Sequence, residues 1–190
     1  MADKIDYKFL SDREGGSKTQ GYVPAVNKSK SGVTIATGFD LGQRSESDLK
    51  ALGLSSTLVS KLKPYAGIKA KEAQDLLKKK PLVINANQAA EIDKLIKKKH
   101  IDDIKQKYNA AIKEGATKFE DLPPEAQTVI TSVSFQYGTN LKSAAPKFWG
   151  AVTSSDWKKT KEILNDFGDA YPTRRGLEAD LIGEIEDEKN

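Results

Sequence analysis

Cysteine is absent from this chain, and histidine and methionine each occur once. Without cysteine the fold cannot depend on disulfides, and thiolate metal sites and thiol nucleophiles are excluded. The chain is therefore expected to fold equally well in a reducing cytoplasm and in an oxidising periplasm.

The single histidine, His100, is the one imidazole that could serve in a catalytic triad. It follows three consecutive lysines, and nothing near it resembles a nucleophile elbow. We interpret His100 as part of a solvated helix face. Hydrolytic chemistry would then rest on carboxylates, and no metal or other cofactor is expected because no cluster of metal ligands is visible.

Long apolar runs are missing as well. No stretch approaches the roughly 18 residues that a membrane-spanning helix needs, so membrane insertion is not expected. The first six residues carry charges where a signal peptide would have an apolar segment. We expect the protein to be made in the cytoplasm without a signal peptide and to reach any outside target by another route.

Positive charge is in slight excess, with a formal net charge of +4 and short lysine runs at 78–80 and 97–99. Such runs are most often solubilising, but they also attract polyanions such as cell wall or nucleic acid. Aromatic residues do not alternate with the basic ones, and no nucleic-acid-binding motif is present. Nucleic acid is therefore not an expected partner.

The order of sequence patterns predicts a mainly helical α+β fold. A short helix capped by Asp3 is expected to end at Gly15 and Gly16, which places Glu14 at its last turn. Residues 21–42, rich in turn formers and β-branched residues, predict a hairpin or meander with a half-buried strand around Val33 and Ile35.

The remainder predicts helices almost throughout. The chain length allows one domain with two lobes: a small β-containing lobe at about 15–86, a long helix capped by Asn87 at about 87–109, and a helical lobe at about 110–190 that includes the first helix. Further helices are expected from Ser45 to Gly53, over 71–79, from Pro123-Pro124 to Gly138, around 148–149, over 155–167 and after Thr173.

Two carboxylates have the surroundings that glycoside hydrolysis requires. One group must protonate the leaving oxygen, and a second carboxylate must activate water or attack directly. Glu14 lies beside apolar residues and suits the acid, Asp40 suits the second role, and Thr34 has the parity to hold the water. By themselves, however, a Glu before glycines is more often a charged helix end, and an Asp in a glycine turn is more often a turn former.

The residues around this pair resemble the start of pesticin-like muramidase domains, which are related to the T-even phage lysozymes. The resemblance is carried by Glu14-Gly15-Gly16, by Gly21-Tyr22-Val23-Pro24 and by Ser31-Gly32-Val33-Thr34-Ile35-Ala36-Thr37-Gly38-Phe39-Asp40-Leu41-Gly42-Gln43. It implies a lysozyme-like bilobal fold and a catalytic set of Glu14, Thr34 and Asp40. The family usually has glycine where this chain has Ala36.

The far end of the chain is similar to the same family. Phe135-Gln136-Tyr137-Gly138 resembles the helix end that lines the sugar cleft of phage lysozymes, which implies that Gln136 and Tyr137 bind substrate. Thr173-Arg174-Arg175 resembles an Asn-Arg-Arg segment whose first arginine faces the catalytic glutamate. The match implies this role for Arg174, with Arg175 as the alternative.

The resemblance implies an N-acetylmuramidase that cleaves peptidoglycan between N-acetylmuramic acid and N-acetylglucosamine, with inversion. The protein would be the antibacterial, bacteriolytic domain of an effector toxin, a bacteriocin or a phage lysin. It would act as a monomer in the periplasm or cell wall of a target bacterium, and an immunity protein is a possible partner. The alternatives are a non-catalytic module that binds cell-wall glycan, a nucleic-acid-binding protein, or an enzyme for another glycan such as chitin.

Overall fold

A computed structural model describes residues 3–27 and 30–187 of the chain. Its contacts divide the described residues into two compact units. We call residues 14–99 the β unit, and residues up to Arg13 together with those from His100 onward the helical unit. The described residues are mainly helical with one small sheet, which confirms the predicted α+β class.

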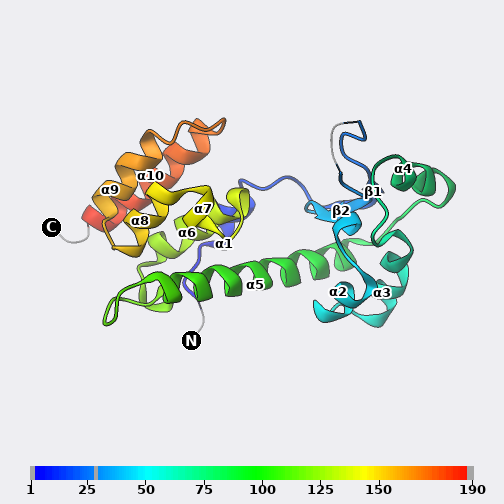
Figure 1. Cartoon of the computed structure of the whole chain (residues 1–190), viewed down its shortest axis with the longest axis horizontal. Helices are drawn as coiled ribbons and strands as arrows, with labels where there is room; N and C mark the ends of the chain where they lie inside the picture. Colours follow the sequence, from blue (N-terminus) through cyan, green and yellow to red (C-terminus); the bar gives the residue numbers. More distant parts are fainter. Residues whose placement is uncertain (1–2, 28–29, 188–190) are drawn as a thin grey trace. The chain divides into compact units, whose positions relative to one another are not determined.

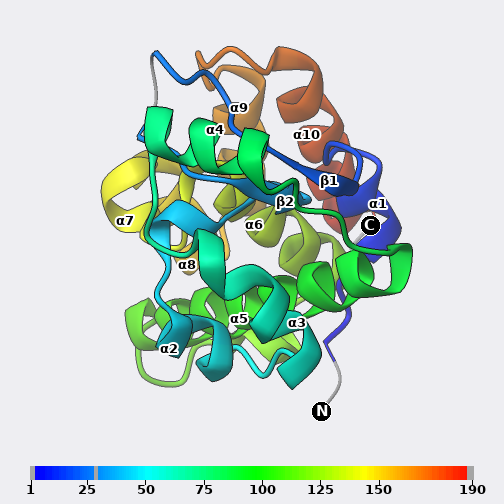
Figure 2. The ribbon, with the colours of Figure 1, turned by 90° about the vertical axis from the view of Figure 1, so that its right-hand side faces the viewer.

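The β unit contains a three-stranded antiparallel sheet in the order β1-β2-β3, as the predicted meander requires. Figure 1 shows the strands and helices of this unit, and Figure 2 shows α4 running beside the sheet. Its elements are β1 (Lys18–Tyr22), β2 (Thr34–Ala36), β3 (Phe39–Asp40), η1 (Leu41–Gln43), α2 (Glu46–Ala51), α3 (Ser56–Leu62), η2 (Lys63–Tyr65), α4 (Ala70–Lys79) and the first part of α5 (Ala86–Ala111).

The central strand β2 is more buried than its pattern predicted. A half-buried strand was expected, but all three of its residues are buried. Ile35 and Ala36 belong to the hydrophobic core of this unit. The hydroxyl of Thr34 donates a hydrogen bond to the carbonyl of Gly32, 3.2 Å away. A polar side chain can be buried when it has a hydrogen-bond partner inside the protein. The alternation of polar and apolar residues therefore did not predict that Thr34 is buried.

The N-cap of helix α5 lies two residues earlier than expected. The predicted cap was Asn87, whereas Asn85 accepts a hydrogen bond from the backbone N–H of Gln88 at 2.8 Å. The side chain of Gln88 returns the bond to the N–H of Asn85 at 3.0 Å. This reciprocal arrangement is a capping box, in which each side chain satisfies a backbone donor that the helix leaves unpaired.

The helical unit is built around α6, which is buried along nearly all of its length. Prolines 123 and 124 start α6 and Gly138 ends it with φ of 80°, as predicted. Helices α9 and α10 lie side by side (Figure 1). The elements are α1 (Tyr7–Ser11), the second part of α5, η3 (Phe119–Asp121), α6 (Pro124–Tyr137), α7 (Leu141–Ala144), α8 (Pro146–Thr153), α9 (Trp157–Asn165) and α10 (Pro172–Asp187).

Helix α1 is shorter than the sequence pattern predicted. Its N-cap is Asp6, which accepts from the N–H of Phe9, and not Asp3. The helix ends at Ser11, so Glu14 lies beyond it and not on its last turn. The sequence predicts that the helix ends at the glycines 15 and 16, but its last hydrogen bond of the α-helical type runs from the N–H of Asp12 to the carbonyl of Lys8.

His100 is not on a solvated face, and that interpretation of the sequence was wrong. The imidazole is half-buried, lies edge-on to the ring of Phe135 at 4.7 Å, and its Nε2 is 2.8 Å from Oγ of Ser134. The Ser134 hydroxyl donates its proton to the carbonyl of Thr131. Nε2 of His100 must therefore carry the donated hydrogen, which fixes the tautomer of the neutral ring.

The burial of His100 predicts a pH dependence of stability. Burial lowers the pKa of His100 from its ordinary 6.5, so the unfolded chain binds this proton more readily than the folded one. The contribution of the neutral His100 to the free energy of unfolding is then fully present above pH 6.5, and it decreases as the pH falls below that value. We expect the melting temperature to decrease less between pH 7 and pH 5 in His100→Gln than in the wild type. An equal decrease in both proteins would contradict this role.

Candidate active site

Thr34 and Asp40 are directly opposite each other on neighbouring antiparallel strands. The register of β2 and β3 pairs these two residues. Both side chains also converge on one residue of the preceding loop: Thr34 donates to the carbonyl of Gly32, and Asp40 accepts from the N–H of Gly32 at 2.9 Å. The hydroxyl and the carboxylate are thus held against the same backbone segment.

One carboxylate oxygen of Asp40 is fully used for this purpose. Oδ1 accepts from the N–H groups of Gly32 and Gly42, both at 2.9 Å, and the second bond caps η1. The half-buried Arg44 stacks on Phe39 at 4.3 Å and lies close enough to Asp40 to interact electrostatically. Burial lowers the pKa of Arg44, and the carboxylate of Asp40 counteracts that effect. Asp40 is therefore rigidly oriented beside a fixed cation.

The position of Asp40 depends on a close backbone approach that only glycine permits. A Cβ added at Gly32 would lie 2.2 Å from the carbonyl oxygen of Ile68 and 2.5 Å from Cα of Gly42. A Cβ at Gly42 would lie 2.6 Å from the nitrogen of Gly32. Because these atoms belong to the backbone, they cannot move aside by changing a rotamer.

We therefore expect Gly32→Ala to destabilise the protein by at least ~1–3 kcal/mol, the usual effect of overpacking. It should also reduce any activity of the site, since both Thr34 and Asp40 bond to residue 32. Gly150→Ala on α8 is the matched control, because a Cβ there meets nothing within 4 Å. Chemical denaturation of both variants measures the difference. A Gly32→Ala protein as stable as the control would show that the loop adapts.

Glu14 lies in the β unit, in the loop between α1 and β1. Its carboxylate forms an ion pair with the ammonium of Lys97 on α5, with 3.0 Å between Oε2 and Nζ. Both side chains are largely buried, at 17% and 26% exposed respectively. The sequence predicted that this carboxyl lies at a helix end among apolar side chains. In the structure Glu14 lies in a loop and faces a lysine instead.

Asp93, four residues before Lys97, holds two other segments next to these candidates. Its Oδ1 accepts from the N–H of Thr37 at 3.0 Å, and its Oδ2 accepts from the hydroxyls of Thr37 at 3.0 Å and Ser17 at 2.7 Å. Ser17 follows Glu14 by three residues, and Thr37 lies in the turn between β2 and β3. Neither Asp93 nor Lys97 could be recognised from the sequence, because an acidic and a basic residue four apart are typical of a solvated helix face.

The turn between β2 and β3 has an unusual backbone. Ala36 has φ of 53°, in the left-handed region, and Gly38 has φ of 76°. Glycine adopts such angles readily, whereas alanine does so at a cost. Ala36 therefore occupies a position whose backbone conformation favours glycine, the residue that the resemblance led us to expect there.

The other predicted site residues belong to the helical unit. Gln136 and Tyr137 form the last turn of α6. The side-chain oxygen of Gln136 is buried and accepts no hydrogen bond from the described residues. The hydroxyl of Tyr137 donates to Asp169 at 2.6 Å, and its ring contacts Phe167. Burial and then the bond to Asp169 raise the pKa of Tyr137 to about 12.

Arg174 and Arg175 occupy different surroundings at the start of α10. Arg174 donates to the carbonyls of Ser132 at 2.8 Å and Arg13 at 3.4 Å, so it contacts the residue that precedes Glu14. Arg175 is buried and bonds to Glu178 at 2.6 Å. Of the two arginines, Arg174 is thus the one that reaches the segment leading to Glu14.

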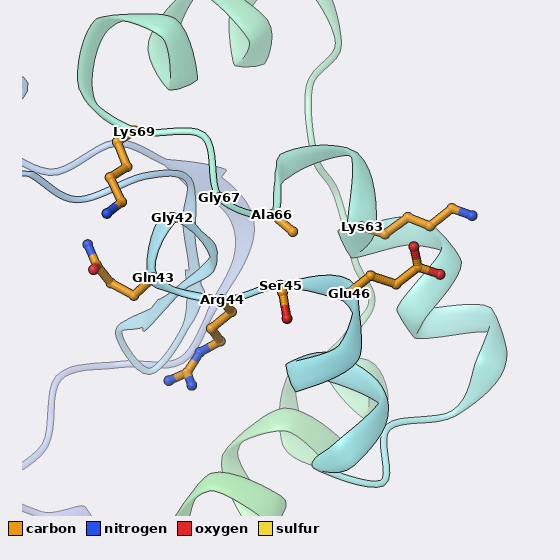
Figure 3. A pocket seen from close by; sticks show the side chains of 9 residues that line it. All are labelled: Gly42, Gln43, Arg44, Ser45, Glu46, Lys63, Ala66, Gly67 and Lys69. Carbon is orange, nitrogen blue, oxygen red and sulfur yellow. The ribbon is translucent and has the colours of Figure 1, made fainter.

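A hollow of about 530 Å³ lies on the β unit beside the turn that follows Asp40 (Figure 3). Three cationic side chains come from its walls, those of Arg44, Lys63 and Lys69, and Glu46 is the one acidic residue among those that line it. Glu46 already pairs with Lys50 at 3.0 Å. The hollow therefore has a positive character, and the buried Nε of Arg44 has no hydrogen-bond partner in the described chain.

Within residues 3–27 and 30–187, no three acidic or histidine side chains gather as metal ligands would. The helices of that same part of the chain also include none long and apolar enough to cross a membrane.

A comparison with protein families identifies one model that matches most of the chain. The family is pesticin, described as a bacterial toxin homologue of phage lysozyme, C-terminal part, and its model matches residues 4–158. The match contains Glu14, Thr34, Asp40, Gln136 and Tyr137 and ends before Arg174. No curated protein sequence matches the chain significantly.

Proposed function

The chain belongs to the pesticin family of bacterial toxins homologous to phage lysozyme, and from this we propose that it is an N-acetylmuramidase of bacterial cell wall. A muramidase-type lytic role follows from the family. The proposal adds the bond, which is the β-1,4 linkage between N-acetylmuramic acid and N-acetylglucosamine. The observation that supports it best is the opposed pair of Thr34 and Asp40 in one compact unit with Glu14.

In this mechanism Glu14 is the general acid. Its carboxyl donates a proton to the glycosidic oxygen as the bond to the anomeric carbon breaks. The two glycines that follow Glu14 leave open space around the loop backbone, since a Cβ at either would meet no atom within 4 Å. The backbone next to the acid is therefore not covered by protein side chains.

Thr34 and Asp40 position the attacking water. The Thr34 hydroxyl gives its own proton to Gly32, so towards a water molecule it can act only as an acceptor. Asp40 has both bonds from glycine N–H groups on Oδ1, which leaves Oδ2 to accept from the same water. A water that donates to both groups keeps an oxygen lone pair for the anomeric carbon. Asp40 takes the proton that this water loses as the new C–O bond forms, as an inverting reaction requires.

Substrate binding is proposed for the remaining candidates. Gln136 is half-buried on the last turn of α6, and its side-chain amide can form hydrogen bonds with the acetamido and hydroxyl groups of a sugar. The ring of Tyr137 would offer an apolar surface to a sugar, while its hydroxyl stays on Asp169. The cations around the hollow beside Asp40 would attract the carboxylates that peptidoglycan carries on its stem peptides.

The context that we propose is antibacterial. The protein would act as a monomer on the wall of a target bacterium, as an effector, a bacteriocin domain or a phage lysin, and an immunity protein would protect the producer. A non-catalytic module that binds cell-wall glycan is the competing hypothesis. The oriented oxygens of Thr34 and Asp40 argue against it, because binding alone would not need them.

The test is digestion of purified peptidoglycan, followed by borohydride reduction and mass analysis of the soluble fragments. A muramidase releases disaccharide peptides whose reducing end is muramic acid. A Glu14→Gln preparation controls for lytic enzymes from the expression host. Release of fragments that end in reducing N-acetylglucosamine would assign a different bond. Wall that binds the protein but releases nothing would support the binding module instead.

A further inference from the structure

The loop that carries Glu14 has few contacts of its own. Gly15 and Gly16 are exposed, and a Cβ added at either would meet no atom within 4 Å. The two ends of this short loop are both attached to α5. Glu14 pairs with Lys97 at 3.0 Å, and the Ser17 hydroxyl donates to Asp93 at 2.7 Å. Within the β unit, these two bonds fix the loop.

The two α5 residues are spaced so that they can act together. Residues four apart on a helix lie on the same face, about 5–6 Å between their Cβ atoms. Glu14 and Ser17 are separated by only two residues, so the loop spans this one helical turn. Asp93 and Lys97 are partly buried by the contact, whereas Lys94 and Lys98 on the same helix are exposed.

Asp93 also extends the attachment to the other half of the candidate site. It accepts two hydrogen bonds from Thr37, one from the backbone N–H and one from the hydroxyl, both at 3.0 Å. Thr37 is three residues from Thr34 and three from Asp40, in the turn that connects their strands. A single carboxylate therefore ties the loop of the acid to the turn of the water-binding pair.

We propose that Lys97 and Asp93 are positioning residues for the reaction, forming a clamp on α5 that sets Glu14 relative to Thr34 and Asp40. The proposal rests on the proposed function. Lys97 orients the Glu14 side chain by pairing with it while it is ionised. Glu14 takes up a proton before the reaction and gives it to the leaving oxygen, and the charge of Lys97 stabilises the carboxylate that remains. Asp93 holds the two backbone segments in register. Neither side chain contacts the substrate in this scheme, and Lys97 acts through the carboxyl group of Glu14.

Kinetics on soluble peptidoglycan fragments test the contribution of Lys97. We expect Lys97→Met to lower kcat about tenfold with little change in KM, because a small misplacement of a catalytic group reduces the rate strongly. Lys97→Arg keeps a cation at the site and should restore most of the rate. Lys98→Met, an exposed neighbour on α5, should match the wild type. A Lys97→Met enzyme within twofold of the wild type would overturn the clamp.

Hydrogen exchange tests the contribution of Asp93 without any activity. The amide of Thr37 donates to Asp93, so Asp93→Ala should speed its exchange about tenfold, the effect of losing one hydrogen bond. Asp102→Ala, an exposed site on the same helix, is the control. Unchanged exchange at Thr37 would refute the attachment. If the wild type proves inactive on cell wall, the proposed function fails, and this measurement still decides whether the attachment exists.

Discussion

Replacing Glu14 with glutamine is expected to reduce kcat on peptidoglycan by about 10²–10⁴-fold, the usual contribution of a general acid. Glutamine has nearly the same shape but cannot donate the proton that the leaving oxygen needs. The ion pair with Lys97 is lost, yet a single pair of this kind contributes only ~0–1 kcal/mol when it is partly exposed. The folded protein and its affinity for cell wall should therefore change little.

The measurement is the initial rate of muropeptide release, combined with thermal melting and a wall-pelleting assay on the same preparations. Glu114→Gln is the matched control, because Glu114 is exposed in the loop after α5. We expect this control to retain wild-type activity. A Glu14→Gln enzyme with a third or more of the wild-type rate would remove Glu14 from the role of acid.

The largest expected loss of stability follows from Glu178→Ala. Glu178 is fully buried on α10, where one carboxylate oxygen faces Arg175 at 2.6 Å and the other faces Arg174 at 3.4 Å and the Ser132 hydroxyl. Burial raises the pKa of Glu178, and the two arginines act against this effect. Removal of the carboxylate would leave Arg175 buried, with Asp169 as its one ionic partner among the described residues.

Loss of one partner from a buried ion pair costs about 3–5 kcal/mol, because the remaining charge is left without compensation. In a protein of this size such a loss lowers the melting temperature by about 10 °C. Calorimetry of Glu178→Ala measures it, with Glu184→Ala, an exposed position two turns along α10, as the control. Melting temperatures that agree within 2 °C would show that the arginines find other partners.

The same variant links stability to the candidate site. Arg174 bonds to Glu178 and also to the carbonyl of Arg13, next to Glu14 in the chain. Loss of the carboxylate frees the guanidinium from one of its anchors. Activity that falls further than the loss of folded protein explains would indicate that Arg174 helps to hold this segment.

The sequence predicted best those features whose cause is local. The start of α6 at two prolines and its end at a glycine depend on backbone angles that these residues impose. The cap of α2 at Ser45 is equally local. The sequence also predicted that Thr34 and Asp40 share strand parity, but not that they lie opposite each other on two strands separated by the turn at Thr37 and Gly38.

The features that it predicted poorly depend on partners far along the chain. Glu14 meets a lysine 83 positions later, and no local pattern connects the two. Asp93 and Lys97 look like solvated residues until the loop and turn that they hold are placed against α5. The surroundings of His100 were not predicted for the same reason, because its contacts Ser134 and Phe135 both come from α6. The local sequence around a residue does not show which distant segments contact it in the folded protein.

The left-handed backbone of Ala36 limits how far this protein can be stabilised without altering its site. An alanine in that conformation costs about 1–2 kcal/mol relative to the right-handed region, and Ala36→Gly would release the strain at the turn between Thr34 and Asp40. The methyl group of Ala36 also restricts the turn, since a glycine at this position could adopt more backbone conformations than an alanine whenever the turn opens. Ala36 therefore lowers the melting temperature but restricts the conformations of the turn between Thr34 and Asp40. Substitutions meant to raise the melting temperature are better placed on α8 or α10 than at this turn.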